Sequence, residues 1–183
     1  MNWGILGAGS VAQRRVLPAI RELEGHAVAG LMVRDIRRAK VLASQFGAGR
    51  AYDSVDGLVQ DEAVDALYVS SPVNWHLEHV LKAVDAGKHV FCEKPLAMTR
   101  GECQQIISAC AGAGVMLGVC FVLRGWPIYQ RIRHLMEEGH LGTIVELRSH
   151  LAKWTPREQG EWRLDPEQSG GGTLIDVATH YLD

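Results

Sequence analysis

The chain contains 183 residues, of which 47% are hydrophobic and 22% are charged, and its formal net charge is −2. These proportions are typical of a globular protein and exclude an intrinsically disordered chain. A near-neutral charge without a run of basic residues argues against nucleic acid and membrane surfaces as partners, so a small molecule is expected. The sequence contains no long apolar segment and no basic leader, and a cytoplasmic location is therefore expected.

The cysteines form no C-x-x-C pair and fall in stretches with strand or helix patterns. They are Cys92, Cys103, Cys110 and Cys120. A zinc site or a disulfide framework is therefore not expected, and a reducing compartment is predicted. His76 and His79 share one predicted helix, but no third ligand is placed nearby, so no metal is predicted.

Short apolar runs alternate with segments of helical period from the amino terminus to about residue 120, which is typical of βαβ units. The predicted strands are Trp3–Leu6, Ala27–Val33, Ala66–Val69, His89–Cys92 and Val115–Val119, with a weaker one at Arg50–Tyr52. The predicted helices are Val11–Glu24, Ile36–Phe46, His76–Ala86 and Arg100–Ala113. This order predicts the α/β class, with a Rossmann-type doubly wound parallel sheet.

The pattern changes from about Trp126. Pro127 begins a predicted helix that ends near Glu138, and Thr143–Leu151 reads as one longer strand. A polar loop, three glycines and a last helix from about Thr173 follow. One strand cannot make a second sheet alone. We therefore expect residues 1–120 to form a complete domain and residues 121–183 to form the incomplete beginning of an α+β second domain.

A glycine motif, Gly7-Ala8-Gly9-Ser10-Val11-Ala12, follows the first predicted strand and opens the first predicted helix. Gly7 permits a tight turn, Gly9 lets a pyrophosphate approach the backbone, and Ala12 lets the helix pack on the strand. The free N–H groups of the helix start would face the phosphates. The alternative is a tight strand-to-helix turn without a ligand.

The second predicted strand ends at Val33, where an acidic residue would accept the ribose hydroxyl of NAD. Arg34 follows instead, and Arg38 lies at the start of the next helix. These cations suit the 2′-phosphate of NADP, although they also fit an ordinary exposed helix face. Asp35 could serve an NAD ribose. The sequence thus favours NADP and leaves NAD possible.

Two further motifs carry side chains suited to proton transfer. Glu93-Lys94-Pro95 follows a predicted strand, at the sheet edge where open α/β folds bind ligands. Asp176 and His180 share one face of the last helix, a spacing that by itself is common on ordinary polar faces.

Together these motifs resemble the Gfo/Idh/MocA oxidoreductases, the family of glucose–fructose oxidoreductase and inositol dehydrogenase. The resemblance rests on the glycine motif, on Ser71-Pro72-Val73-Asn74-Trp75-His76, on Glu93-Lys94-Pro95, on Trp162-Arg163-Leu164-Asp165-Pro166, and on the triple glycine with Asp176 and His180. Members of the family are longer, and their remaining residues complete the substrate pocket and often an oligomer interface. The resemblance implies that this chain is truncated in its C-terminal domain.

The resemblance also assigns roles to individual residues. It implies that Lys94 hydrogen-bonds the reacting oxygen, that His180 acts as acid or base, and that Asp176 assists substrate binding. It implies a cis peptide at Lys94–Pro95 and substrate contact by Arg163. The residues expected at the cofactor, beyond the glycine motif, are Val33, Arg34, Arg38, Ser71, Pro72, Asn74, His76, Glu93, Lys94 and Pro95.

The leading functional hypothesis is an NAD(P)-dependent oxidoreductase acting on a sugar, inositol or related polyol. One alternative is a relative that uses the cofactor for non-redox turnover, such as glycoside cleavage. Another is a nucleotide-binding fragment without catalysis. Because the predicted strand and last helix would leave edges and apolar side chains uncovered, a homo-oligomer is expected.

Overall fold

A computed structural model describes residues 1–150 and 165–183 of the chain. Arg163 and the last residue of the predicted strand Thr143–Leu151 lie outside these ranges. Within the described ranges, no helix has the length and apolar character needed to cross a membrane.

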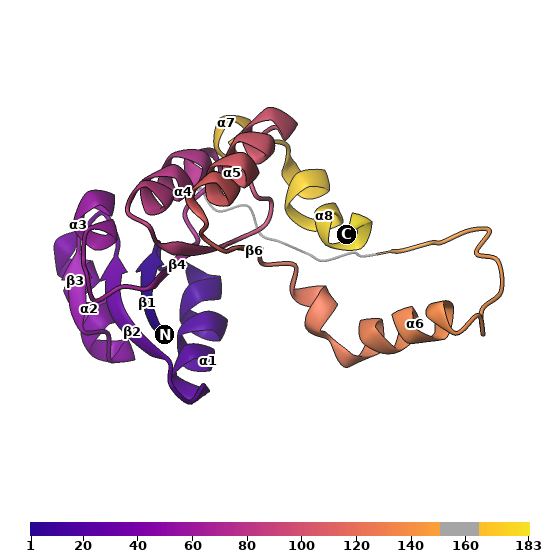
Figure 1. Cartoon of the computed structure of the whole chain (residues 1–183), viewed down its shortest axis with the longest axis horizontal. Coiled ribbons are helices and arrows are strands. Elements are labelled where there is room, and N and C mark those ends of the chain that lie inside the picture. The colour runs from indigo at the N-terminus through magenta and orange to yellow at the C-terminus, as the bar shows by residue number, and fades with distance from the viewer. Residues whose placement is uncertain (151–164) are drawn as a thin grey trace.

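A six-stranded sheet forms the centre of the amino-terminal part, and all neighbouring strands pair in parallel (Figure 1). The strand order is β3-β2-β1-β4-β5-β6, which confirms the predicted Rossmann-type arrangement. The strands are β1 (Asn2–Leu6), β2 (Ala27–Met32), β3 (Arg50–Tyr52), β4 (Ala66–Val69), β5 (His89–Cys92) and β6 (Leu117–Val119).

Helices cover both faces of this sheet. They are α1 (Leu17–Glu22), which a π-helical turn at Ala12–Val16 precedes, and then α2 (Ile36–Phe46), α3 (Val55–Val59), α4 (His76–Asp85) and α5 (Arg100–Ala113). Residues of α1 and α2 pack in one buried cluster, and residues of α3, α4 and α5 pack in another. The sheet therefore has a separate core on each face.

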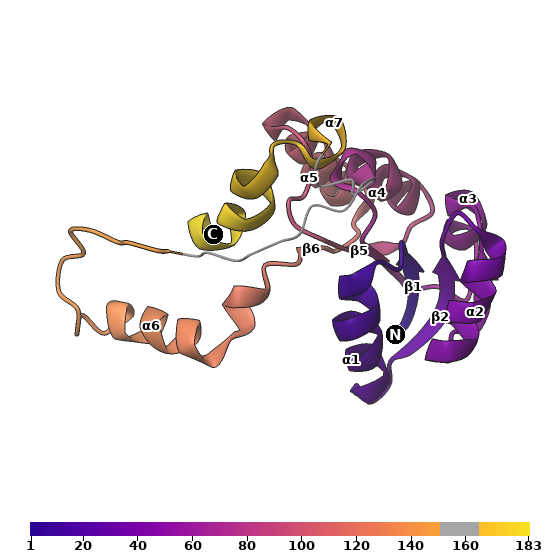
Figure 2. The same ribbon diagram turned by 180° about the vertical axis from the view of Figure 1, so that it is seen from behind.

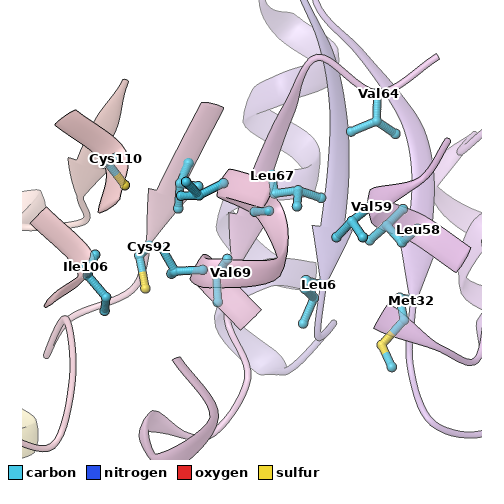
Figure 3. Packing of buried hydrophobic residues seen from close by; sticks show 14 of the residues in the cluster. Leu6, Met32, Leu58, Val59, Val64, Leu67, Val69, Cys92, Ile106 and Cys110 are labelled. Atoms are coloured by element: carbon cyan, nitrogen blue, oxygen red, sulfur yellow. The ribbon is translucent and has the colours of Figure 1, made fainter. Parts of the chain in front are cut away.

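Strand β4 contributes to both cores because successive side chains in a strand point to opposite faces. Leu67 and Val69 belong to the cluster with α3, α4 and α5, whereas Tyr68 belongs to the cluster with α1 and α2. Figure 3 shows Leu67 and Val69 among the side chains of the first cluster. All four residues of β4 are buried, as expected for a central parallel strand.

The helix boundaries follow from local capping. Asp35 accepts a hydrogen bond from the backbone N–H of Arg37 and begins α2, and Thr99 caps α5 in the same way through Glu102. Gly47 and Gly114 end these helices with φ values of 68°, a left-handed conformation that glycine adopts at low cost.

After β6, a single-turn 3₁₀ helix (Val122–Gly125) leads to α6 (Pro127–Glu137). Figures 1 and 2 show α6 and the following segment extending away from the sheet. The carboxyl-terminal part returns as α7 (Pro166–Ser169), a π-helical turn (Leu174–Ala178) and α8 (Thr179–Leu182). The predicted final helix is present, and α7 forms where only a loop was predicted.

The prediction of a strand at Thr143–Leu151 was wrong for the residues that can be tested. Residues 143–150 have no regular secondary structure. A strand requires a hydrogen-bonded neighbour, and no strand in the described part of the chain pairs with this segment. The sequence pattern alone therefore does not produce a strand here.

Candidate functional site

The candidate site lies where the strand order reverses, at the carboxyl ends of β1 and β4. Gly7 follows β1 with a φ of 87° and donates its N–H to the carbonyl of Met32 at 3.0 Å. A Cβ at this position would lie 2.9 Å from the backbone nitrogen of Ser71, in the loop after β4. The close approach of the two loops and the positive φ both require glycine here.

The rest of the glycine motif forms an open cradle at the start of the first helical segment. A Cβ built on Gly9 meets no atom within 4 Å, and the side chain of Val11 is 46% exposed. Ala12 is fully buried against the sheet. The motif therefore leaves open space in front of free helix N–H groups, which is the geometry that a pyrophosphate requires.

The residues after β2 present cations to solvent. Val33 is held by a hydrogen bond from its N–H to the carbonyl of Tyr52 at 3.2 Å, and Arg34 and Arg38 are exposed. The carboxylate of Asp35 accepts the N–H of Arg37 at 2.9 Å as the cap of α2. Because Asp35 already serves the helix, the arginines are the freer polar groups at this end of the site.

The loop after β4 divides its residues between solvent and the interior. Asn74 is exposed and Pro72 is half-buried, whereas His76 is only 1% exposed. The Nδ1 atom of His76 lies 3.0 Å from the carbonyl oxygen of Pro95, and Nε2 lies 2.9 Å from that of Ser71. The buried His76 side chain therefore contacts the backbones of two loops.

His79 lies one turn further along α4 and is also buried. Its Nδ1 atom lies 2.9 Å from the hydroxyl of Ser71, and its ring stacks on Trp75 with centroids 6.0 Å apart. Burial lowers the pKa of His79 to about 4. At neutral pH His79 is therefore uncharged, and its Nδ1 atom shares one hydrogen bond with the Ser71 hydroxyl.

Lys94 lies in the turn after β5, and its peptide bond to Pro95 is cis. The Nζ atom of Lys94 donates to the carboxylate of Asp176 at 2.9 Å and also to the backbone carbonyl of Asp176. Their side chains are 13% and 29% exposed, respectively. The lysine is thus held at the sheet edge by a residue 82 positions further along the chain.

His180 lies beside this pair. Its ring meets the edge of the Phe121 ring at 6.3 Å between centroids. Burial lowers the pKa of His180, and the nearby Lys94 charge lowers it further. Its buried Nδ1 atom has no hydrogen-bond partner among the described residues. A neutral imidazole with an unused ring nitrogen is suited to accept or donate a proton.

The structure therefore brings Lys94, Asp176 and His180 together. Arg163, the remaining predicted substrate residue, lies outside the described residues. Sequence reasoning missed Tyr68, whose hydroxyl donates to Oε1 of Glu93 at 2.5 Å. A polar atom within an otherwise apolar strand was the signal that could have found it.

Two family models match this chain. Residues 1–121 match an oxidoreductase family with an NAD-binding Rossmann fold, and residues 129–183 match the Gfo/Idh/MocA C-terminal domain.

Among curated proteins, the chain is similar to two sugar-converting enzymes. The 1,5-anhydro-D-fructose reductase of Ensifer adhaerens is 38% identical over 182 residues, which make up 100% of this chain and 54% of that protein. The D-xylose 1-dehydrogenase (NADP(+)) 2 of Haloferax volcanii is 34% identical over 98% of this chain and 54% of that protein. The chain spans about half the length of these relatives.

Two solved structures share the fold of this chain. The 3-ketoreductase KijD10 of Actinomadura kijaniata, in complex with NADP and TDP-benzene, has a TM-score of 0.85 and 30% identity over 98% of this chain and 55% of that chain. The aldose-aldose oxidoreductase of Caulobacter crescentus, complexed with glycerol, has a TM-score of 0.85 and 29% identity over 100% of this chain and 55% of that chain.

Proposed function

The chain belongs to the Gfo/Idh/MocA oxidoreductase family, and on that premise we propose that it binds NADP, with NAD as the second candidate. In the whole protein, the reaction is hydride transfer between this cofactor and a secondary alcohol of a sugar, inositol or related polyol. The named relatives, a fructose-derivative reductase and a xylose dehydrogenase that uses NADP, support this substrate class.

The cofactor site combines the open cradle with the exposed arginines. Residues Gly7 to Ala12 would hold the pyrophosphate, because a Cβ at Gly9 would enter empty space at the helix start. Arg34 and Arg38 would bind the 2′-phosphate through their guanidinium groups. The nicotinamide end would lie toward Ser71, Pro72, Asn74 and the turn formed by Glu93, Lys94 and Pro95, since ligands of such sheets cross the switch point.

When bound, the nicotinamide supplies or accepts the hydride. Lys94 would hydrogen-bond the reacting oxygen through an Nζ atom that Asp176 already orients. His180 would accept the hydroxyl proton during oxidation and return it during reduction. Arg163 would contact the substrate. The observation that carries this proposal is the Lys94–Asp176 pair beside His180, because it joins residues from both matched segments.

We also propose a role for each of the two parts of the chain. Residues 1–120 act as the cofactor-binding domain, and residues 121–183 begin the domain that binds substrate and supports homo-oligomers. The four free cysteines fit a cytoplasmic location.

Cofactor binding is tested on this chain by titrating NADPH and NADH and following their fluorescence. Gly9→Val should abolish binding, because its side chain would project into the cradle from a Cβ that meets no atom of the fold within 4 Å. Gly112→Val is the matched control, since a Cβ there also meets no atom within 4 Å but lies on α5. Equal binding by both variants would contradict the proposed site.

Turnover is tested in the whole protein with a panel of polyols, by the change in absorbance of the reduced cofactor. Net reduction of NADP supports the oxidoreductase. Glycoside cleavage without net change of the cofactor would favour non-redox chemistry, and binding without any turnover would favour the nucleotide-binding fragment.

A further inference from the structure

Tyr68 lies inside β4 and is fully buried, yet it carries a polar hydroxyl into the interior. Its ring packs among the apolar residues between the sheet and α1 and α2, with the Phe91 ring centroid 6.1 Å away. A phenylalanine would supply the same ring contacts. The hydroxyl therefore calls for an explanation beyond packing.

The hydroxyl of Tyr68 donates to Oε1 of Glu93 at 2.5 Å. Burial and the charge of Glu93 both raise the pKa of Tyr68, so the hydroxyl keeps its proton and remains a donor. A hydrogen bond to an ionised acceptor is about twice as strong as one between neutral groups. This contact fixes one oxygen of the Glu93 carboxylate.

The other oxygen of the same carboxylate accepts a hydrogen bond from the next residue. Oε2 of Glu93 accepts the backbone N–H of Lys94 at 3.2 Å. The backbone N–H of Glu93 is itself bonded to the carbonyl of Val69 at the end of β4. A continuous path of hydrogen bonds thus runs from the interior of β4 through Glu93 to the turn that carries Lys94.

We propose that Tyr68 is a positioning residue, which orients the Glu93 carboxylate and through it the turn and side chain of Lys94. This inference rests on the proposed role of Lys94 at the reacting oxygen. Glu93 acts as the link, because its two oxygens serve the strand and the turn separately. Tyr68 therefore acts on Lys94 through Glu93, the residue to which its hydroxyl donates.

The same arrangement affects His180 through charge. The negative charge of Glu93 raises the pKa of His180, opposing the effects of burial and of Lys94. Loss of the Tyr68 hydroxyl would remove a donor that stabilises the ionised carboxylate. Tyr68→Phe should therefore release the carboxylate from its position, weaken its effect on His180 and move the titration of His180 to lower pH.

The chain offers a matched control for this substitution. Tyr52 also donates its hydroxyl to a carboxylate, Oδ2 of Asp61 at 2.7 Å, but it lies on the edge strand β3. Tyr68→Phe and Tyr52→Phe each remove one hydroxyl from one tyrosine–carboxylate pair. A general loss of stability should affect both variants, whereas a positioning role concerns Tyr68 alone.

The first measurement is the rate at which acetic anhydride acylates the Lys94 amine, followed by mass spectrometry. Lys40, which is exposed on α2, serves as the internal reference. Tyr68→Phe should raise the Lys94 rate relative to Lys40 by about twofold to tenfold, the range expected for one hydrogen bond. Tyr52→Phe should leave this ratio unchanged.

The second measurement is the titration of the His180 ring proton by NMR, which needs no turnover. It should move to lower pH in Tyr68→Phe and stay in place in Tyr52→Phe. Unchanged Lys94 and His180 in Tyr68→Phe, or equal changes in Tyr52→Phe, would overturn the proposal. NADPH binding by the same samples reports separately on the proposed function.

A second variant keeps the test decisive if Tyr68→Phe fails to fold. Glu93→Gln retains an oxygen that can accept the Lys94 N–H but removes the charge. It should lower the pH at which His180 titrates while changing the Lys94 acylation rate little. An unchanged His180 titration in this variant would also overturn the link through Glu93.

Discussion

At the scale of single residues, the ammonium of Lys94 is oriented before any substrate is present. Both of its described partners belong to Asp176, one on the side chain and one on the backbone. An ammonium carries three donors, so one remains for a substrate oxygen. His180 has a complementary feature, a buried ring nitrogen without a described partner. Donor and acceptor are therefore both available in one place.

Lys94→Ala and His180→Asn, made in the whole protein, should each lower kcat by roughly 10²–10⁴-fold, the usual cost of losing general acid–base catalysis. NADPH affinity should stay near the wild-type value, because the pyrophosphate cradle is formed by other residues. Steady-state kinetics and fluorescence titration measure the two quantities. The exposed Lys40 on α2 provides a control in Lys40→Ala, and unchanged turnover in either site variant would remove that residue from the mechanism.

Arg34→Glu should weaken NADP binding far more than NAD binding, because only NADP presents a phosphate to this side chain. A charge-assisted hydrogen bond contributes about 1.5–3 kcal/mol, which corresponds to roughly a 10- to 150-fold loss of affinity. Isothermal titration with both cofactors measures the ratio. Arg21→Glu, on the exposed surface of α1, makes the same charge change elsewhere. Equal losses for both cofactors would contradict a 2′-phosphate site.

At the scale of elements, the sequence predicted strands and helices where pattern and capping agree. The bounds of α2 and α5 match because Asp35 and Thr99 cap their starts and glycines end them. Strand β4 matches because its continuous apolar run is buried on both faces, and β5 matches with Val90 and Cys92 buried on one face. Helices α3 and α7 were missed, since five and four residues are too few to show a helical period.

The site was predicted less completely than the fold. The reason is that the positions of its side chains depend on contacts between residues distant in sequence. The motifs identified Lys94, Asp176 and His180, but no local pattern shows that His76 faces two carbonyl groups. Likewise, the hydroxyl of Tyr68 gains its partner only when β4 and β5 lie side by side. Such partners follow from sheet pairing, which a single sequence does not specify by residue.

A buried histidine on α4 should make the stability of the fold depend on pH. His79 is 8% exposed, and burial lowers its pKa to about 4, whereas an unfolded histidine titrates near 6.5. Between these pH values His79 is protonated in the unfolded chain but not in the folded chain. The free energy of unfolding therefore falls as the pH falls from about 6.5 to 4. Because one pKa unit corresponds to about 1.36 kcal/mol, the free energy of unfolding falls by up to about 3 kcal/mol over this range. Burial lowers the pKa of His76 in the same direction.

Urea unfolding at several pH values measures this dependence. His79→Asn retains an acceptor for Ser71 but does not titrate, so its stability should fall less steeply below pH 6.5. His134→Asn, at an exposed position on α6, should keep the wild-type slope. A wild-type stability that is constant from pH 6.5 to 4 would contradict a neutral buried His79.

At the scale of the whole molecule, α6 and the last helix carry apolar side chains that are exposed in the described part of the chain. Ile128, Ile132 and Met136 recur on one face of α6 and are 59%, 40% and 45% exposed. Leu174 and Leu182 are 66% and 79% exposed. Apolar patches of this kind mark interaction surfaces.

We therefore expect the chain to self-associate, and Ile132→Lys should shift it toward the monomer by placing a charge in the uncovered face of α6. Sedimentation equilibrium over a range of concentrations measures the molecular mass. Val41→Lys is the control, since Val41 is 65% exposed but stands alone on α2. A wild-type protein that stays monomeric at all concentrations would show that these faces need no partner.

The strand order has a consequence for how the protein is made. Each strand of the sheet joins an edge of the strands already synthesised: β2 and β3 extend one side of β1, and β4, β5 and β6 then extend the other. No later strand must insert between two earlier ones. The sheet can therefore form strand by strand during synthesis. However, one edge of β1 stays unpaired until β4 has been synthesised. An unpaired strand edge can pair with another chain, so the nascent chain is prone to aggregate during that interval.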